Sequence, residues 1–338
     1  MITASRAFTL RLAQALLVVW GVTLVAFVIS RVLPGNPVYL VVGPYADPNT
    51  VAEATERLGL DHSVAEQYRV YMSDLLHGDL GRSITTSNPV TVDLGQRIPA
   101  TVELALAAMA MTIVFAFPIG IIAAMKPGGI GGRLADVVSA GGVAIPQFWL
   151  GLMLIYFFFF RLSWFPPPLG RLPSDVAGES TGWVWVGSFF RGDFSVWWEA
   201  TRALALPAFV LAFTAMPPLI QAIRTGLSAA LSSDAVRTAR ALGLRSSTTM
   251  RDALRIASLP ILEMLALIVG ILISSAVLVE TVFSWPGIGQ YAVQAVNASD
   301  YAALQGVVLV SAVTYVVVYL VVEGVQLLLD PRLARPTR

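Results

Sequence analysis

The residues that could carry chemistry are few in this chain, and many of them are arginines gathered in one segment. Residues 232–255, SSDAVRTARALGLRSSTTMRDALR, contain five arginines, whereas charged residues make up only 13% of the chain. The sequence has no G-x-x-x-x-G-K-[ST] motif, and its single lysine, Lys126, lies in MKPGGIGG without a following serine or threonine. A phosphate-cradling P-loop cannot form from such a sequence. We therefore expect this chain to bind no cofactor and any ATP to be hydrolysed by a partner.

Catalytic and metal-binding motifs do not emerge from the remaining polar residues. The two histidines, His62 and His77, are fifteen residues apart and the chain has no cysteine, so a metal site built from side chains is not expected. A polytopic membrane enzyme is one alternative class. The expected cytoplasmic connections contain no HExxH, no GxSxG and no paired carboxylate motif, so this alternative is disfavoured.

The arginine-rich segment predicts two short helices that meet at a glycine. Ser233 or Asp234 can cap the start of the first helix, and Gly243 suits the left-handed position that ends it. We expect a second helix to start after a cap at Ser246 or Ser247 and to end at Pro260, where an apolar stretch begins.

The first of these helices has an apolar ridge between cations. Val236, Ala239 and Leu242 recur at three-residue spacing, with arginines at either side. This pattern is typical of a helix that docks in a groove of another protein. The alternative is an anchor that lies on anionic lipid.

Composition indicates that the helices around this segment lie in a membrane. Hydrophobic residues make up 56% of the chain, more than in a soluble domain. A bilayer core about 30 Å thick requires roughly 20 apolar residues of helix. Long apolar runs in which apolar and polar residues do not alternate predict transmembrane helices rather than a β-barrel. The segments predicted to span are 12–30, 104–125, 137–160, 203–223, 261–279 and 304–329.

The distribution of positive charge predicts the orientation of these spans. Basic residues are concentrated in 1–11, 126–136, 224–260 and the C-terminal tail, whereas 283–303 has none. Because cytoplasmic connections carry the excess of Lys and Arg, we expect both termini in the cytoplasm. With a net charge of only +1, nothing indicates a nucleic-acid partner.

Polar residues within or beside the spans are candidates for a translocation path. Glu280 and Glu323 are ionisable groups in or next to apolar stretches, and Gln147 lies within the third span. Such residues are often functional in membrane proteins. A proton-coupled secondary transporter would use them for coupling and is a second alternative class.

The external connection 34–97 predicts a small helical region. Asp47-Pro48 and the capping box Ser63-Val-Ala-Glu66 start two short helices, and Gly59 and Gly78 end them. The connection holds eight acidic residues against four arginines. This acidic balance suits contact with a substrate-binding protein, for which Asp61, Glu66 and Asp79 are the candidate residues, or with a cationic peptide; the alternative is a solvated face.

Several blocks resemble one family. DAVRTARALGLRSSTTMRDALRIASLPIL is similar to the EAA loop of ABC importer permeases, in the variant of the dipeptide and oligopeptide permease B-type subunits. Arg237 replaces the glutamate of the general motif. The resemblance extends over almost the whole chain through FVISRVLPGNPV, LGLDHSVAEQY, VAIPQFWLGLML, VETVFSWPGIGQYAVQAV and LLLDPRLARP.

The resemblance implies an all-α membrane protein with six transmembrane helices, the type I ABC importer permease fold, in the cytoplasmic membrane. Implied partners are a second homologous, C-type permease, two ATP-binding subunits that carry ATP and Mg, and an extracytoplasmic substrate-binding lipoprotein. The implied substrate is a short peptide; relatives import glutathione, nickel complexes or heme. The expected ATPase-coupling residues are Asp234, Val236, Arg237, Thr238, Ala239, Arg240, Leu242, Gly243 and Leu244.

The expected organisation follows from these assignments. It comprises the first span (1–33), an extracytoplasmic helical region (34–99), a transmembrane core with the coupling loop 224–260 (100–330) and a cytoplasmic tail (331–338).

Overall fold

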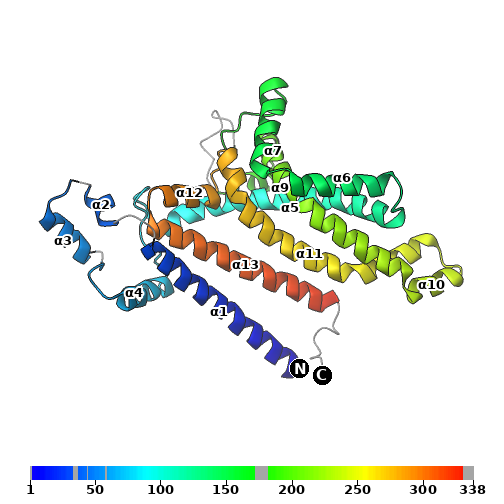
Figure 1. Cartoon of the computed structure of the whole chain (residues 1–338), viewed down its shortest axis with the longest axis horizontal. Helices are drawn as coiled ribbons and strands as arrows, with labels where there is room; N and C mark the ends of the chain where they lie inside the picture. Colours follow the sequence, from blue (N-terminus) through cyan, green and yellow to red (C-terminus); the bar gives the residue numbers. More distant parts are fainter. Residues whose placement is uncertain (1, 33–36, 44, 58, 172–181, 330–338) are drawn as a thin grey trace. The chain divides into compact units, whose positions relative to one another are not determined.

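The computed structural model describes residues 2–32, 37–43, 45–57, 59–171 and 182–329. These residues are mostly helical and contain no β-strand, only an isolated antiparallel bridge between Arg82 and Pro89. Figure 1 shows the helices in chain order. They are α1 (Ile2–Val32), α2 (Pro37–Val42), α3 (Pro48–Arg57), α4 (Val64–Leu76), α5 (Val90–Met125), α6 (Ile130–Ala144), α7 (Gln147–Leu154), the π-helix η1 (Ile155–Arg161), α8 (Trp185–Arg191), α9 (Phe194–Ser232), α10 (Asp234–Ala241), α11 (Ser246–Val282), α12 (Ile288–Asn297) and α13 (Tyr301–Leu329).

The chain divides into two compact units. The first comprises Met1–Ala100 and Pro286–Val316, and the second comprises Thr101–Trp285 and Val317–Arg338. The tail predicted at 331–338 lies outside the described residues.

Several helices are long and apolar enough to cross a membrane. Within the described residues, four helices meet this test, namely α5, α9, α11 and Tyr301–Val321 of α13. The bent pair Ile130–Ala144 and Gln147–Arg161 would be a fifth candidate span if the two helices together count as one span. α1 contains a shorter apolar stretch, Ala13–Val28. An all-α, multi-pass membrane protein is thus confirmed, and the count of six spans stays a prediction.

The segment of the third predicted span, 137–160, is not one straight helix in the structure, and its crossing of the membrane stays a prediction. The structure breaks it between α6 and α7 with a bend of 104°. Ile145 adopts φ −86° and ψ 118°, an extended conformation. The cause is Pro146, which lacks an amide hydrogen and disfavours helical geometry in the residue before it.

The predicted helix boundary at Pro260 is also wrong. α11 runs unbroken from Ser246 to Val282 with Pro260 inside it, and its N-cap is Arg245 rather than a serine. A Cβ added to Gly226 of α9 would lie 3.4 Å from Cγ of Pro260, so the proline packs closely against that helix. A proline inside a helix removes one hydrogen bond and crowds the carbonyl four residues earlier, and the extensive packing of α11 along α9 offsets this cost.

In the first unit, aromatic side chains join α1 to α4, and an apolar cluster joins the start of α5 to α12 and α13. The ring of Phe27 on α1 lies 5.2 Å from that of Tyr68 and 5.8 Å from that of Tyr71 on α4. The buried cluster comprises Val90, Leu94, Ile288, Tyr291, Ala295, Ala303 and Val307.

The predicted caps of the external helices are confirmed. Asp47 Oδ1 accepts hydrogen bonds from the amides of Asn49 (2.9 Å) and Thr50 (3.1 Å) at the start of α3. Ser63 Oγ accepts from the amide of Glu66 at 3.3 Å at the start of α4.

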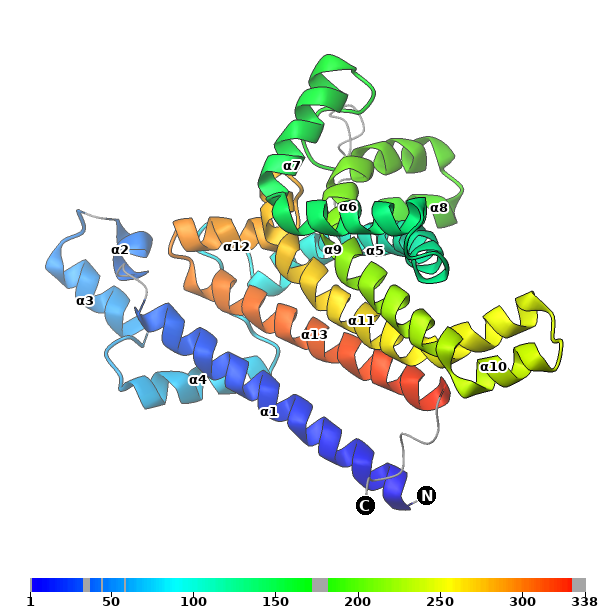
Figure 2. The same ribbon diagram turned by 45° about the vertical axis from the view of Figure 1, so that its right-hand side comes forward.

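The second unit is organised around α9. This helix packs against α6, α7, α8, α10 and α11, and Figures 1 and 2 show α9 and α11 side by side. Its buried residues include Leu211, Leu219, Ile220 and Ile223. A Cβ added to Gly142 of α6 would lie 2.5 Å from Pro217 Cγ, so α6 contacts α9 through a glycine.

Candidate functional site

The candidate coupling surface is α10, the short helix between α9 and α11. The Ser233 side chain accepts a hydrogen bond from the amide of Val236 at 3.4 Å, which confirms the predicted cap. Asp234 lies in the first turn, where a carboxylate interacts favourably with the helix dipole. The start of α10 is therefore set by its own sequence.

The end of α10 is a Schellman motif built on Gly243. The amide of Gly243 donates to the carbonyl of Arg240 at 3.0 Å, and that of Leu244 donates to the carbonyl of Ala239 at 3.1 Å. Gly243 has φ +74°, the left-handed conformation predicted for it. A Cβ there would meet no atom within 4 Å, so backbone conformation alone demands the glycine.

The predicted apolar ridge of α10 needs one correction. Val236 is only 1% exposed, because α10 packs against α9 and α11 and Val236 anchors it there. It is not part of an outward ridge. Leu242, at 75% exposed, is the most exposed large apolar side chain of the segment, and Leu244 is also exposed.

Exposed charged side chains precede Leu242 along α10. The side chains of Arg237 and Asp234 are 74% and 99% exposed, and Arg237 Nη1 lies 3.7 Å from Asp234 Oδ1. Thr238 and Arg240 are exposed, and Ala239 is half-buried. The outward face of α10 is thus cationic and contains one large apolar side chain, a combination that suits a protein groove.

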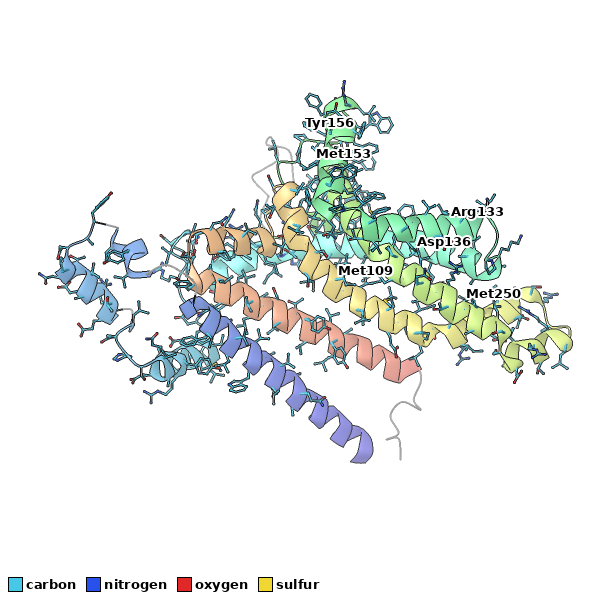
Figure 3. The ribbon with its side chains drawn as sticks, viewed as in Figure 1. Met109, Arg133, Asp136, Met153, Tyr156 and Met250 are labelled. Atoms are coloured by element: carbon cyan, nitrogen blue, oxygen red, sulfur yellow. The ribbon has the colours of Figure 1, made fainter. Side chains whose placement is uncertain are left out.

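Short connections join α10 to the two longest helices. α9 has 39 residues and α11 has 37, and α10 starts two residues after α9 ends. Figure 3 labels Met250 at the beginning of α11, close to α10. At 1.5 Å per residue, α9 and α11 are each about 55–60 Å long.

A second contact strengthens this end of the unit. Asp136 of α6, labelled in Figure 3, accepts a hydrogen bond from Arg224 Nη1 of α9 at 2.8 Å. The predicted cytoplasmic connection 126–136 is therefore tied to α9 just before the coupling segment.

The predicted path residues have separate partners. Gln147, at the bend between α6 and α7, donates from Nε2 to Thr214 Oγ1 of α9 at 2.6 Å. Glu280 is fully buried and accepts from Thr101 Oγ1 at 2.6 Å. The side chain of Glu323 lies outside the described residues. Their role in a path stays a prediction.

The three predicted binding-protein contacts lie in the first unit. Asp61 and Asp79 are exposed, and Glu66 has a 44% exposed side chain that pairs with Arg69 at 3.2 Å. Asp79 Oδ1 accepts from the amide of Gly81 at 2.8 Å. All three are accessible enough to contact another protein.

One polar site escaped the sequence analysis altogether. Glu103 and Arg171 form an ion pair with side chains only 1% exposed. The other carboxylate oxygen of Glu103 accepts from the amide of Val186 at 3.0 Å, and Arg171 Nη1 donates to the carbonyl of Gly182 at 2.6 Å. In the amino-acid sequence, the one sign of this site is that Glu103 directly precedes an apolar run. No neighbouring residue indicates that Arg171 is its partner.

A second missed site lies in the first unit. Asp300 is 1% exposed and accepts from Ser83 Oγ (2.6 Å), the amide of Thr85 (3.1 Å) and the amide of Ala303 (3.2 Å). Asp93 accepts from the hydroxyl of Tyr291 at 2.8 Å. These carboxylates hold the 83–93 segment against α12 and the start of α13.

Comparison with known proteins identifies the class of protein. The family described as binding-protein-dependent transport system inner membrane component matches residues 116–335, and its N-terminal component matches residues 5–105. The chain belongs to this family. It is therefore a permease component of a multi-subunit, binding-protein-dependent transport system in the inner membrane, and it is not itself an enzyme.

Individual relatives match over nearly their full length. The probable D,D-dipeptide transport system permease protein DdpB of Escherichia coli is 38% identical over 322 residues, 94% of each chain. The dipeptide transport system permease protein DppB of Alkalihalophilus pseudofirmus is 35% identical, over 96% of this chain and 97% of its own. The di/tripeptide transport system permease protein DppB of Pseudomonas aeruginosa is 38% identical, over 93% and 94%.

Proposed function

We propose that this chain is the permease subunit of an ATP-driven ABC importer of short peptides, coupled to separate ATPase subunits through α10. The observation that carries the proposal is the exposed face of α10 on a helix that is capped at both ends and joined to α9 and α11. The peptide substrate is inferred from the dipeptide and di/tripeptide transport systems for which several relatives, 33–38% identical to this chain, are named.

The ATPase subunits would supply the groove that receives α10. Leu242 would bury its apolar side chain in that groove, and Arg237 and Arg240 would face acidic residues at its rim. Such a contact favours one conformation of the permease only if it is stronger in that conformation. Closure of the ATPase dimer would thereby move α9 and α11 together and switch a central cavity between inward and outward facing.

The complete transporter would contain a second, C-type permease, two ATPase subunits carrying ATP and Mg, and a substrate-binding lipoprotein that docks near Asp61, Glu66 and Asp79. Six spans with both termini in the cytoplasm would follow if α1 and the bent α6–α7 pair each cross the membrane. The charge distribution supports that orientation, since the basic connection 224–260 includes α10.

The proposal is tested with the reconstituted complex. Leu242→Asp should abolish ATP hydrolysis stimulated by the binding protein and should also abolish dipeptide uptake, while the permease still inserts and assembles in the membrane. Arg240→Glu should weaken stimulation strongly.

Arg251→Glu is the matched control, because Arg251 is an exposed arginine on α11 outside α10. It should leave coupling near the wild-type level. Normal stimulated hydrolysis and uptake with Leu242→Asp would refute the coupling role of α10.

A further inference from the structure

The first unit contains a cavity of about 220 Å³ that the proposed transport mechanism does not use. It is lined by Phe27 of α1, by residues of α4, by the turns at 59–62 and 79–81, and by residues of α13. Figure 2 shows α1 and α4 close together, and the contact of Phe27 with Tyr71 closes one wall. Apolar and polar side chains share its surface.

Two buried polar atoms at this cavity have no hydrogen-bond partner among the described residues, the side-chain oxygen of Gln67 and the hydroxyl of Tyr71. Gln67 Nε2 donates to the carbonyls of His62 (2.9 Å) and Leu60 (3.4 Å). These two hydrogen bonds fix the orientation of the Gln67 side-chain amide, because rotating the amide by 180° would place its oxygen against two carbonyl oxygens. A buried polar group without a partner costs about 1–3 kcal/mol.

The charge of the cavity is negative. Asp74 and Asp79 line it, and no lysine or arginine is among the described residues that do so. Carboxylates in a partly enclosed site attract a cation more strongly than they do in open water. Burial raises the pKa of Tyr71, so its hydroxyl keeps its proton at neutral pH.

We infer that this cavity binds the primary ammonium group of a small molecule that also carries an apolar side chain. An ammonium group has three donors and no acceptor, which matches the oxygen of Gln67 and the carboxylates of Asp74 and Asp79. Phe27 and Leu80 contact the apolar part. The volume is below the roughly 300–1,000 Å³ of pockets for larger ligands, so the site takes one amino-acid-sized group.

Two kinds of molecule carry a primary ammonium group next to an apolar side chain, a short peptide with a free amino end and a free amine. The first source rests on the proposed peptide import, whereas ammonium binding does not. Because the site lies in the first unit and α10 lies in the second, coupling and ammonium binding can be tested separately.

The test uses the purified full chain in lipid nanodiscs and isothermal titration calorimetry. The probes are leucinamide, leucyl-leucine, isoamylamine and N-acetyl-leucinamide. The three amines should bind and the acetylated probe should not, because acetylation removes the positive charge. Tighter binding of leucyl-leucine than of isoamylamine assigns the site to peptides, and the reverse order assigns it to free amines.

Asp74→Asn and Gln67→Leu should each weaken leucinamide binding at least tenfold. Glu53→Gln is the matched control, because Glu53 is an exposed carboxylate on α3 outside the cavity. Circular dichroism verifies that each variant is folded. Equal binding of the acetylated and free amines, no binding of any amine, or unchanged affinity in Asp74→Asn overturns the inference.

Discussion

Glu103 of α5 and Arg171 of the 161–184 connection form an ion pair in which both side chains are only 1% exposed. The pair lies inside the second unit and is extended by the amide of Val186 and the carbonyl of Gly182. The two residues are 68 positions apart along the chain. Their ion pair therefore ties Arg171 to the membrane helix α5.

Removing one partner of this pair should destabilise the protein strongly. Arg171→Met leaves the carboxylate of Glu103 buried without its counter-charge, a change that typically costs about 3–5 kcal/mol. The thermal unfolding midpoint of the purified protein in detergent measures the effect. The double variant Glu103→Leu with Arg171→Met should recover much of the loss, since no buried charge is left.

The control for this prediction is the pair of Glu199 and Arg202, whose side chains are each 34% exposed. Arg202→Met should cost less than about 1 kcal/mol, because water already screens that pair. An equal shift of the midpoint in both arginine variants would contradict the role of burial.

Gly142→Ala should disturb the contact between α6 and α9. The added Cβ would lie 2.5 Å from Pro217 Cγ and 2.7 Å from the carbonyl oxygen of Phe213, and the backbone oxygen cannot rotate away. Overpacking of this kind costs about 1–3 kcal/mol. Gly21→Ala on α1 is the control. No atom lies within 4 Å of its added Cβ, and alanine favours a helix by about 1 kcal/mol. A stable Gly142→Ala protein would show that the helices are not in close contact.

Asp300→Ala should loosen the 83–90 segment. The substitution removes the acceptor for Ser83 Oγ and for the amides of Thr85 and Ala303. Hydrogen exchange of those two amides should accelerate. Ser83→Ala removes only one of the three bonds and should produce a smaller effect confined to the segment around Thr85. Unchanged protection of Thr85 in Asp300→Ala would rule out this anchoring.

Stability should fall at alkaline pH through Tyr291. Burial raises the pKa of this phenol to about 12, with a further contribution from its hydrogen bond to Asp93. Its pKa in the unfolded chain is about 10, so the folded state retains the proton over a range in which the unfolded state has lost it. The stabilisation is therefore complete below pH about 10 and is lost as the pH rises towards about 12.

Unfolding midpoints measured from pH 9 to 12 test this prediction. The wild-type protein should lose stability more steeply than Tyr291→Phe, which has no phenolic proton. Parallel curves for the two proteins would contradict it.

The sequence predicts local features of this fold well, because their causes are local. Ser233 and Ser63 start helices through hydrogen bonds to amides three residues ahead, and Gly243 and Gly78 adopt positive φ where a helix ends. Pro146 shows the limit of such reasoning. The proline accounts for a break at this position, whereas the angle of 104° between the two helices belongs to the folded chain, in which α6 and α7 both pack against α9.

The candidate coupling surface was predictable in part. The caps and cations of α10 follow from neighbouring residues, whereas the burial of Val236 depends on two other helices. Residue spacing predicts that Val236 and Leu242 share one ridge, yet Val236 is buried and Leu242 is 75% exposed.

The membrane character, the family and several helix ends, such as those at Ser233 and Gly243, follow from the amino-acid sequence, because hydropathy, motif order and capping depend on composition or on a few neighbouring residues. Which buried charges meet is visible only in the folded chain. Glu103 reaches Arg171, and Ser83 reaches Asp300 across 217 residues of chain. Pairings over such distances arise from packing, since any of several arginines or hydroxyls could satisfy a buried carboxylate until the helices select one.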